Sequence, residues 1–252
     1  MKGINTLKIW AETEIPHQTL GFEMPELPGE TFRLVVPELI SDTEEALLPW
    51  GHPSPKWNID QESARCSIEV SGTLRMAAQV LFQPEKIDVV VTVCNLSDRT
   101  WEQANLFTCF AYFKAPLFDD TDLTRTYFPV GPGTWKPVGD MYAEHSPGDG
   151  PYTFFAVRGG PTLSDLWVCR QIKQNHTQEV SRGAACVVSS CGQWVAGMTS
   201  SNPAYVFNNR SDCCIHADPL LGTIKPGETT QALSTVHIFR GSVEDFDARI
   251  SG

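Results

Sequence analysis

The chain has 252 residues, of which 41% are hydrophobic and 19% charged, so it can bury a sizeable core and is not of disordered composition. Its formal net charge is −11 and no run of five basic residues occurs, which argues against nucleic acid as a partner, because such binding needs clustered cations. No stretch approaches the ~20 apolar residues that cross a bilayer, so no membrane association is expected.

The first twelve residues contain no apolar segment of the kind found in secretory signals. We therefore expect a cytoplasmic protein, or a secreted one from which a signal peptide has been removed. The eight cysteines include no C-x-x-C pair, which argues against a zinc ribbon or a thioredoxin-type redox site. Most are expected to be free thiols in a reducing compartment. Cys213 and Cys214 could form a vicinal disulfide, but one thiol on each face of a strand is the favoured interpretation.

Short strand patterns rich in Val, Ile, Phe, Thr and Cys follow one another through most of the chain, separated by Gly, Pro, Asn and Asp. Their spacing is typical of an all-β sandwich or barrel. No linker divides the sequence, so residues 1–252 are predicted to form a single domain. The predicted strands are Arg65–Ser71, Thr73–Phe82, Lys86–Asn95, Ala104–Phe113, Tyr152–Val157, Asp165–Arg170, Ala184–Ser189, Gln193–Thr199, Ala204–Phe207, Cys213–His216 and Gln231–Arg240.

Turns, loops and one helix complete the predicted organisation. Hairpin turns are expected at Ser71-Gly72, Ser97-Asp98-Arg99 and Cys191-Gly192. Ser242–Ile250 has apolar residues at helical spacing and predicts a short terminal helix. Two segments rich in turn-forming residues, Pro49–Trp57 and Phe118–Gly150, predict long loops of the kind that line functional sites.

The most informative stretch is Cys213–Pro219, in which an apolar strand runs into His216 and Asp218. Residues i and i+2 of a strand share a face, so the carboxylate can orient or charge the imidazole. His216 and Asp218 are therefore predicted as catalytic residues. A structural histidine followed by an Asp-Pro turn is the alternative.

A second group of candidates lies in the loop Phe118–Gly150. Arg125 could bind a substrate carboxylate, or pair with Asp120 or another neighbouring aspartate. Arg125 and Asp120 are predicted to bind substrate, and His145 to join the catalytic residues. The acidic residues here lack the EF-hand pattern and its loop glycine, and no H-x-H or H-x-x-x-H spacing occurs, so no metal-ligand set is assigned and no cofactor is expected.

Five tryptophans fall in or next to predicted loops, where aromatic faces can hold the apolar faces of sugar rings. Trp135 and Trp194 are predicted to stack on a saccharide, and Asn208 completes the predicted substrate-binding residues. A nucleophile elbow, a phosphate-binding loop and a dinucleotide fingerprint are all missing, which argues against serine hydrolases, kinases and Rossmann enzymes.

Two stretches together resemble the galactose mutarotase-like β-sandwich group, which includes the aldose epimerases. Ile87–Asp98 ends in Asn-Leu-Ser-Asp, and with Phe107–Phe113 it is similar to the group's central strand, turn and following strand. Cys214–Pro219 and the Pro-Gly-Glu turn in Lys225–Glu228 are similar to its late strand and last turn. The resemblance implies a two-sheet supersandwich with long loops over a concave face.

The chain departs from the group where the group's catalytic residues lie. Cys109-Phe110 stands where the group has a histidine, and His216 stands where it has a catalytic glutamate. The resemblance therefore implies the fold more than the reaction, and places His216 at a functional position on the concave face.

These observations predict a carbohydrate-active protein that acts on a sugar or sugar acid, as an epimerase, isomerase or lyase with His216 as acid or base. Glycoside hydrolysis fits less well, because it usually needs two placed carboxylates. A non-catalytic carbohydrate-binding module is one alternative. A metalloenzyme using His145, His216 and an aspartate is another, and a purely structural role is a third. The expected partner is a small-molecule or oligosaccharide ligand, and the oligomeric state stays open.

Overall fold

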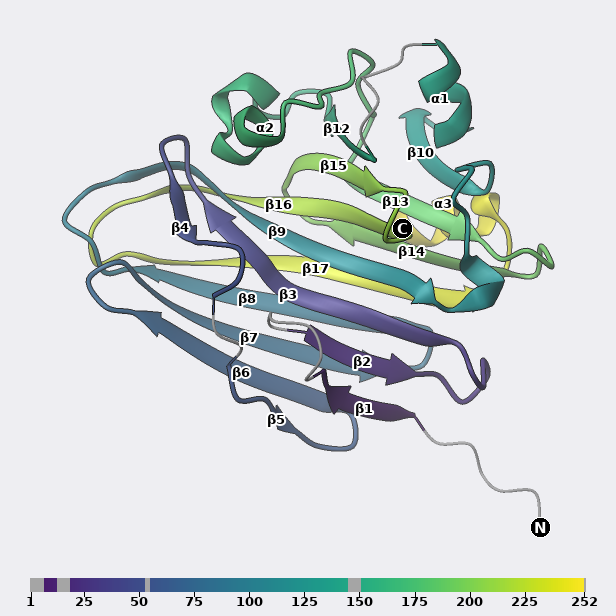
Figure 1. Cartoon of the computed structure of the whole chain (residues 1–252), viewed down its shortest axis with the longest axis horizontal. Helices are drawn as coiled ribbons and strands as arrows, with labels where there is room; N and C mark the ends of the chain where they lie inside the picture. Colours follow the sequence, from purple (N-terminus) through teal and green to yellow (C-terminus); the bar gives the residue numbers. More distant parts are fainter. Residues whose placement is uncertain (1–6, 13–18, 53–54, 145–150, 252) are drawn as a thin grey trace.

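The computed structural model describes residues 7–12, 19–52, 55–144 and 151–251. These residues form two antiparallel sheets that pack face to face (Figure 1). The predicted all-β, two-sheet sandwich is confirmed. No helix among the described residues has the length and apolar character needed to cross a membrane.

The first sheet has the strand order β1-β2-β3-β9-β16-β15-β12, and β4 pairs with β3 at its side. Its strands are β1 (Lys8–Ala11), β2 (Thr19–Glu23), β3 (Thr31–Ser41), β4 (Ala46–Leu48), β9 (Trp101–Lys114), β12 (Tyr152–Ala156), β15 (Pro203–Asn209) and β16 (Cys214–Ile224).

The second sheet has the order β11-β10-β13-β14-β17-β8-β7-β6-β5. Its strands are β5 (Asn58–Ile59), β6 (Ser63–Val70), β7 (Leu74–Gln83), β8 (Lys86–Asn95), β10 (Thr126–Gly131), β11 (Thr134–Pro137), β13 (Ala184–Val188), β14 (Trp194–Ser200) and β17 (Thr229–Arg240).

Strand formation follows from alternation of apolar and polar residues. In β8 the side chains of Ile87, Val89, Val91 and Val93 are buried, while those between them are half-buried. Successive side chains of a strand point to opposite faces, so these four pack on the inner face between the sheets. Strand β9 is buried along both faces, because the first sheet is covered on its outer face as well. The cavity that contains His216 lies on this covered outer face.

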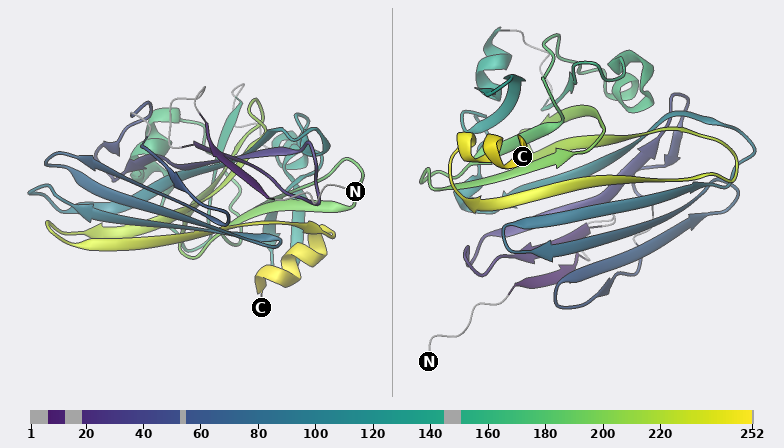
Figure 2. Two further views of the ribbon diagram at one scale, coloured as in Figure 1. Left: turned by 90° about the horizontal axis from the view of Figure 1, so that it is seen from below. Right: turned by 180° about the vertical axis from the view of Figure 1, so that it is seen from behind.

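The helices are short and lie outside the sheets. They are η1 (Pro116–Phe118), α1 (Val138–Glu144), η2 (Leu163–Asp165), α2 (Trp167–Ile172) and α3 (Val243–Ser251). Helix α3 confirms the predicted terminal helix. It lies on the outer face of the second sheet (Figure 2). Its Phe246 packs there with Ala184, Cys186 and Val195. Ser242 caps it, because its hydroxyl accepts from the Asp245 backbone N–H and the Asp245 carboxylate accepts from the Ser242 N–H.

The predicted strand Asp165–Arg170 is wrong, because this segment forms η2 and α2. Leu163, Leu166 and Cys169 recur at a spacing of three residues and bury together against the outer face of the first sheet. A short apolar run does not distinguish a buried strand from one turn of helix, so the sequence pattern was ambiguous here.

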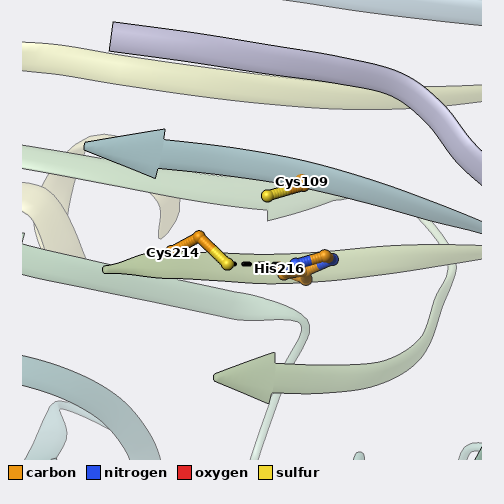
Figure 3. Close-up of side chains that lie close together, drawn as sticks. All are labelled: Cys109, Cys214 and His216. Atoms are coloured by element: carbon orange, nitrogen blue, oxygen red, sulfur yellow. Dashed lines mark hydrogen bonds between the residues drawn. The ribbon is translucent and has the colours of Figure 1, made fainter. Parts of the chain in front are cut away.

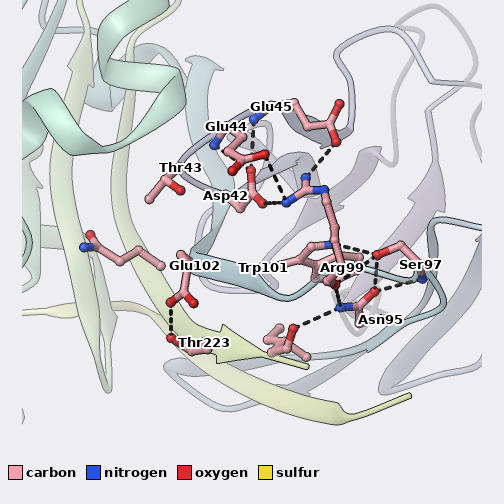
Figure 4. A network of polar contacts seen from close by, with 12 residues as sticks. Asp42, Thr43, Glu44, Glu45, Asn95, Ser97, Arg99, Trp101, Glu102 and Thr223 are labelled. Atoms are coloured by element: carbon pink, nitrogen blue, oxygen red, sulfur yellow. Dashed lines mark hydrogen bonds and ion pairs between the residues drawn. The ribbon is translucent and has the colours of Figure 1, made fainter. Parts of the chain in front are cut away.

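The prediction for the turn Ser97-Asp98-Arg99 is also wrong. It was predicted as a hairpin, but it carries the chain from β8 in the second sheet to β9 in the first. Asn95 holds the turn: its amide donates to the Arg99 and Ile224 carbonyls, and its oxygen accepts from Ser97 (Figure 4). The Arg99 guanidinium pairs with the buried Asp42 carboxylate at 2.5 Å and so ties this corner to the first sheet.

The long segment Phe118–Gly150 was predicted as a loop over the site. As far as it is described, up to Glu144, it contains β10, β11 and α1 instead. Strands β10 and β11 extend the second sheet, and α1 lies at the edge of the sandwich (Figure 1). The outer face of the first sheet is covered by η2, α2 and the segment around Trp50.

Candidate functional site

A cavity of about 530 Å³ opens on the outer face of the first sheet. Strands β2, β3, β9, β15 and β16 form its floor, and Trp50 and Ile172 lie at its side. Its polar lining residues are Thr19, Arg33, Glu38, Asn209, Asp212 and His216. Its aromatic lining residues are Trp50, Phe107, Phe113, Tyr152 and Phe207.

His216 reaches this cavity because of the pleat of β16. Ile215 and Ala217 point into the core between the sheets, so His216 points the other way. Its imidazole ring lies 4.3 Å from the ring of Phe107 and 4.8 Å from that of Phe207, centroid to centroid. Only 1% of the residue is exposed, so the imidazole is buried in the aromatic wall of the cavity.

Asp218 lies behind His216, away from the cavity opening. Its Oδ1 accepts a 2.7 Å hydrogen bond from the Thr108 backbone N–H, which compensates for an interruption in the pairing of β16 with β9. Its Oδ2 lies 3.4 Å from His216 Nδ1, within ion-pair range but not in hydrogen-bond alignment. The predicted pairing of His216 with Asp218 on one face is therefore present in the structure.

Burial and neighbouring charge act against each other on His216. Burial lowers its pKa, but Cys109 and Asp218 more than reverse this, so the pKa of the imidazole is raised. Burial also raises the pKa of the Asp218 carboxyl, and the hydrogen bond with Cys214 and burial hold the pKa of the Cys109 thiol well above its ordinary value. The imidazole therefore lies beside one buried carboxyl group and one buried thiol.

Glu38 is a titratable residue of the cavity that the sequence analysis missed. Between Val35 and Leu39 the register of β3 against β9 shifts: these two pair with Cys109 and Phe107, so four positions on β3 span two on β9. The resulting bulge directs Glu38 into the cavity. Burial is the main reason that the pKa of its carboxyl is raised from 4.5 to about 6.

A signal for Glu38 was present in the sequence. Pro37 interrupts the apolar run of residues 34–40, and a proline inside a strand pattern marks an edge or a bulge. The single carboxylate that follows it is the one ionisable side chain in that run.

Arg33 supplies the cation in the cavity wall. Its Nε lies 2.9 Å from Glu12 Oε1, and both side chains are almost completely buried. Its guanidinium carbon lies 4.6 Å from the centroid of the Phe113 ring. Arg33 is therefore already neutralised and held rigidly before any ligand binds.

Aromatic side chains form the rim of the cavity. Among the described residues, the large hydrophobic side chains that remain exposed are Trp50, Phe113, Tyr152 and Leu233, and the first three line this cavity. Exposed aromatic rings gathered at one opening are typical of a ligand site.

Arg125 and Asp120 lie together elsewhere, with roles inside the fold. Arg125 donates to the backbone carbonyls of Leu117, Asp119 and Val188. Asp120 accepts from the Arg125 backbone N–H and from the Thr126 hydroxyl, and is buried. Neither residue lines the cavity that contains His216.

The remaining predicted site residues are also apart from His216. Trp135 packs against Phe246 of α3 and donates to Asp247. Trp194 lies in β14 of the second sheet, below the Arg240 guanidinium. Asn208 shares the inner face of β15 with Val206, and its Oδ1 accepts from the Tyr142 hydroxyl at 3.4 Å. His145 lies outside the described residues.

Two thiols share the cavity floor with His216. Cys109 of β9 and Cys214 of β16 are buried, and together with the imidazole they are the one cluster among the described residues with the composition and spacing of a metal-ligand set (Figure 3). Cys213 points to the opposite face, where its thiol donates to Asp119 Oδ1 at 3.1 Å. Cys213 lies in the turn just before β16, so the two adjacent thiols point in opposite directions where the strand begins.

No protein-family model and no curated protein matches the sequence. Among solved structures, the chain is similar to a galactose mutarotase related enzyme from Lactobacillus acidophilus, at 11% identity and a TM-score of 0.48, over 95% of this chain and 96% of the other. A galactose mutarotase-like protein from Lactobacillus casei is 9% identical with a TM-score of 0.47, over 92% and 100% of the two chains.

A third similar structure is the alpha-N-acetylgalactosaminidase NagBb from Bifidobacterium bifidum, in complex with GalNAc. It matches 98% of this chain but 37% of its own length, at 8% identity and a TM-score of 0.53. At such identities the likeness concerns the fold alone. The structure has the two-sheet sandwich that the resemblance to the mutarotase-like group implied from the sequence.

Proposed function

We propose that the protein is a carbohydrate-active enzyme that moves a proton on a sugar bound in this cavity, as an epimerase, isomerase or lyase. The observation that carries the proposal is the meeting of His216, backed by Asp218, with Glu38 in one aromatic-lined cavity. The NagBb structure, about a third of which matches this fold, was solved with the sugar GalNAc, and this supports a sugar as the ligand.

Glu38 and His216 suit different roles in proton transfer, because the raised pKa of the His216 imidazole favours its protonated, acid form. An efficient acid or base has a pKa near the working pH, and burial brings the pKa of Glu38 to about 6. The imidazole of His216 exchanges its proton at Nε2, since Nδ1 faces Asp218. Asp218 is a positioning residue in this scheme, because it is fully buried behind the ring.

The cavity rim suits the apolar face of a sugar ring. Trp50, Phe113 and Tyr152 present exposed aromatic surface, while Asn209 and Asp212 offer hydrogen-bonding groups to hydroxyls. The size of about 530 Å³ is in the range of small-molecule sites, which supports a monosaccharide or a short oligosaccharide end.

The test is a panel of neutral sugars and sugar acids, followed by NMR for anomer exchange, for exchange of carbon-bound hydrogen with solvent, and for elimination products. We expect turnover by the wild type and a loss of at least about 100-fold in His216→Gln, the usual scale for a general acid or base. His237→Gln is the matched control, because His237 is a buried histidine of the second sheet. Equal turnover by wild type and His216→Gln contradicts the proposal.

A non-catalytic sugar-binding protein is the second candidate, and the aromatic rim favours it, because such a rim needs no acid or base. The same panel separates the two. Binding of a sugar by wild type and His216→Gln alike, with no new product from either, would support the binding protein.

A further inference from the structure

The floor of the cavity contains three metal-binding side chains. Cys109 comes from β9, and Cys214 and His216 from β16, all on the outer face of the first sheet. Their ligand atoms lie within 4.8 Å of one another, and Cys214 Sγ is 3.6 Å from His216 Nε2 (Figure 3). All three residues are buried.

The distance between Cys214 Sγ and His216 Nε2 is that of a tetrahedral metal site. Zn–S and Zn–N bonds of about 2.3 and 2.0 Å at the tetrahedral angle place sulfur and nitrogen about 3.5 Å apart. The observed separation of 3.6 Å needs almost no rearrangement. Three protein ligands leave a fourth position, and because all three side chains line the cavity, that position faces the space where a ligand enters.

Asp218 supplies the outer support that such sites use. A metal-bound histidine commonly donates its other ring N–H to a carboxylate, which fixes the tautomer and the ring orientation. Asp218 Oδ2 lies 3.4 Å from His216 Nδ1, and its other oxygen is fixed by the Thr108 backbone. Both Oδ2 and Nδ1 are buried without an aligned hydrogen bond, which is unusual for such polar groups. A metal on Nε2 would keep the proton on Nδ1, facing that carboxylate.

We infer that Cys109, Cys214 and His216 form a binding site for one thiophilic metal ion, with Zn²⁺ the best match to a set of two sulfurs and one nitrogen. On binding, both thiols release their protons to solvent, and the two thiolates neutralise the charge of the dication. The fourth ligand is water or a group of the bound molecule.

The metal site goes beyond the proposed function. A bound metal ion would alter the proposed proton transfer. The ion and the exchanged proton both use Nε2 of His216, so the loaded protein has no free imidazole acid or base. We therefore expect Zn²⁺ to inhibit the proton transfer proposed above. Metal binding itself is measured without any substrate, so failure of one proposal is distinguishable from failure of the other.

The experiment uses the full chain, stripped of metal with a chelator and kept reduced. Co²⁺ is titrated into it while the thiolate charge-transfer and tetrahedral d–d absorption bands are recorded, and Zn²⁺ bound after desalting is measured by elemental analysis. We expect one equivalent of either metal, and loss of the absorption bands in Cys109→Ser and in Cys214→Ser. Asp218→Asn should weaken binding by about 10- to 100-fold, the usual effect of removing such an outer partner.

The matched control is Cys66→Ser, because Cys66 is another buried cysteine but lies in β6 of the second sheet. It should bind as the wild type does. Circular dichroism without metal identifies any variant that fails to fold, and competition of Zn²⁺ for bound Co²⁺ in the wild type gives the affinity without any variant. Binding by the wild type far below one equivalent, or equal binding by the Cys109→Ser, Cys214→Ser double variant, would overturn the inference.

Discussion

His216 and Glu38 show how far single residues could be predicted. His216 was found because an ionisable side chain stood in an apolar strand, and alternation alone decides which face it takes. Glu38 depends on a bulge in β3 against β9, which is a pairing between segments about seventy residues apart in sequence. Such long-range pairing gives only a weak signal in the local sequence, which here is the proline before Glu38.

Glu38 also gives a prediction about stability. A carboxyl whose pKa is raised on folding stabilises the protein below its ordinary pKa, and this contribution is lost as the pH rises through the folded value. With a rise from 4.5 to about 6, the charged form costs up to about 2 kcal/mol of folding free energy at pH 7.

Replacement by the neutral isostere, Glu38→Gln, should therefore raise the free energy of unfolding by as much as about 2 kcal/mol at pH 7 and abolish turnover. Urea unfolding of both proteins between pH 4 and 8 measures this. The difference should be near zero at pH 4 and should open between pH 4.5 and 6. A difference that does not depend on pH would show that the carboxyl is not held in its raised state.

At the scale of elements, the strands with clean alternation were the ones predicted well. The prediction Lys86–Asn95 coincides with β8, and those for β6 and β7 differ by one or two residues at their ends. The N-terminal strands β1, β2 and β3 were not predicted. Strand β3 is buried almost throughout and contains Pro37, so it lacks the alternation that marks a half-exposed strand.

Helix α3 depends on one small residue of the sheet beneath it. A Cβ added to Gly197 of β14 would lie 2.6 Å from atoms of the Phe246 ring and 2.9 Å from the Ala185 carbonyl oxygen. We expect Gly197→Ala to destabilise the protein by about 1–3 kcal/mol, the usual cost of overpacking, as α3 is pushed off the sheet.

Thermal and urea unfolding of Gly197→Ala measure this cost. Gly131→Ala is the matched control, since an added Cβ there meets Thr134 at 3.8 Å, an ordinary contact. Equal stability of the two variants would show that α3 can pack on the sheet without the close contact between Gly197 and the Phe246 ring.

At the scale of the whole molecule, the sandwich was predictable and the location of the site was not. Repeated short strands define an all-β fold, but the order of strands in each sheet decides which loops meet. The acidic segment around Arg125 and Asp120 was expected to cover the site, yet it leads into β10, which lies next to the edge strand β11 of the second sheet. The cavity is closed by α2 and the Trp50 segment instead.

The charge of the molecule predicts which sugars bind. The net charge of the chain is −11. The lining of the cavity includes the acidic residues Glu38 and Asp212, while its Arg33 is already paired with Glu12. An anionic sugar acid meets an unfavourable field that salt screens, and a neutral sugar does not. We expect neutral sugars to bind more tightly than the matching uronic acids, with a gap that narrows as salt is raised. Titration calorimetry at two salt concentrations measures it, and tighter binding of the uronic acid would show Arg33 to be available.

The central claim is that the cavity beside His216 is the ligand site, and two tryptophans test it most directly. Trp50 lies at the rim of this cavity, whereas Trp135 packs under α3 in a different part of the molecule. The measurement is the Kd of the best-binding sugar for the wild type, Trp50→Ala and Trp135→Ala. Loss of one stacking ring should raise the Kd at least about 10-fold in Trp50→Ala and leave it unchanged in Trp135→Ala. Unchanged binding in Trp50→Ala together with weakened binding in Trp135→Ala would contradict the claim.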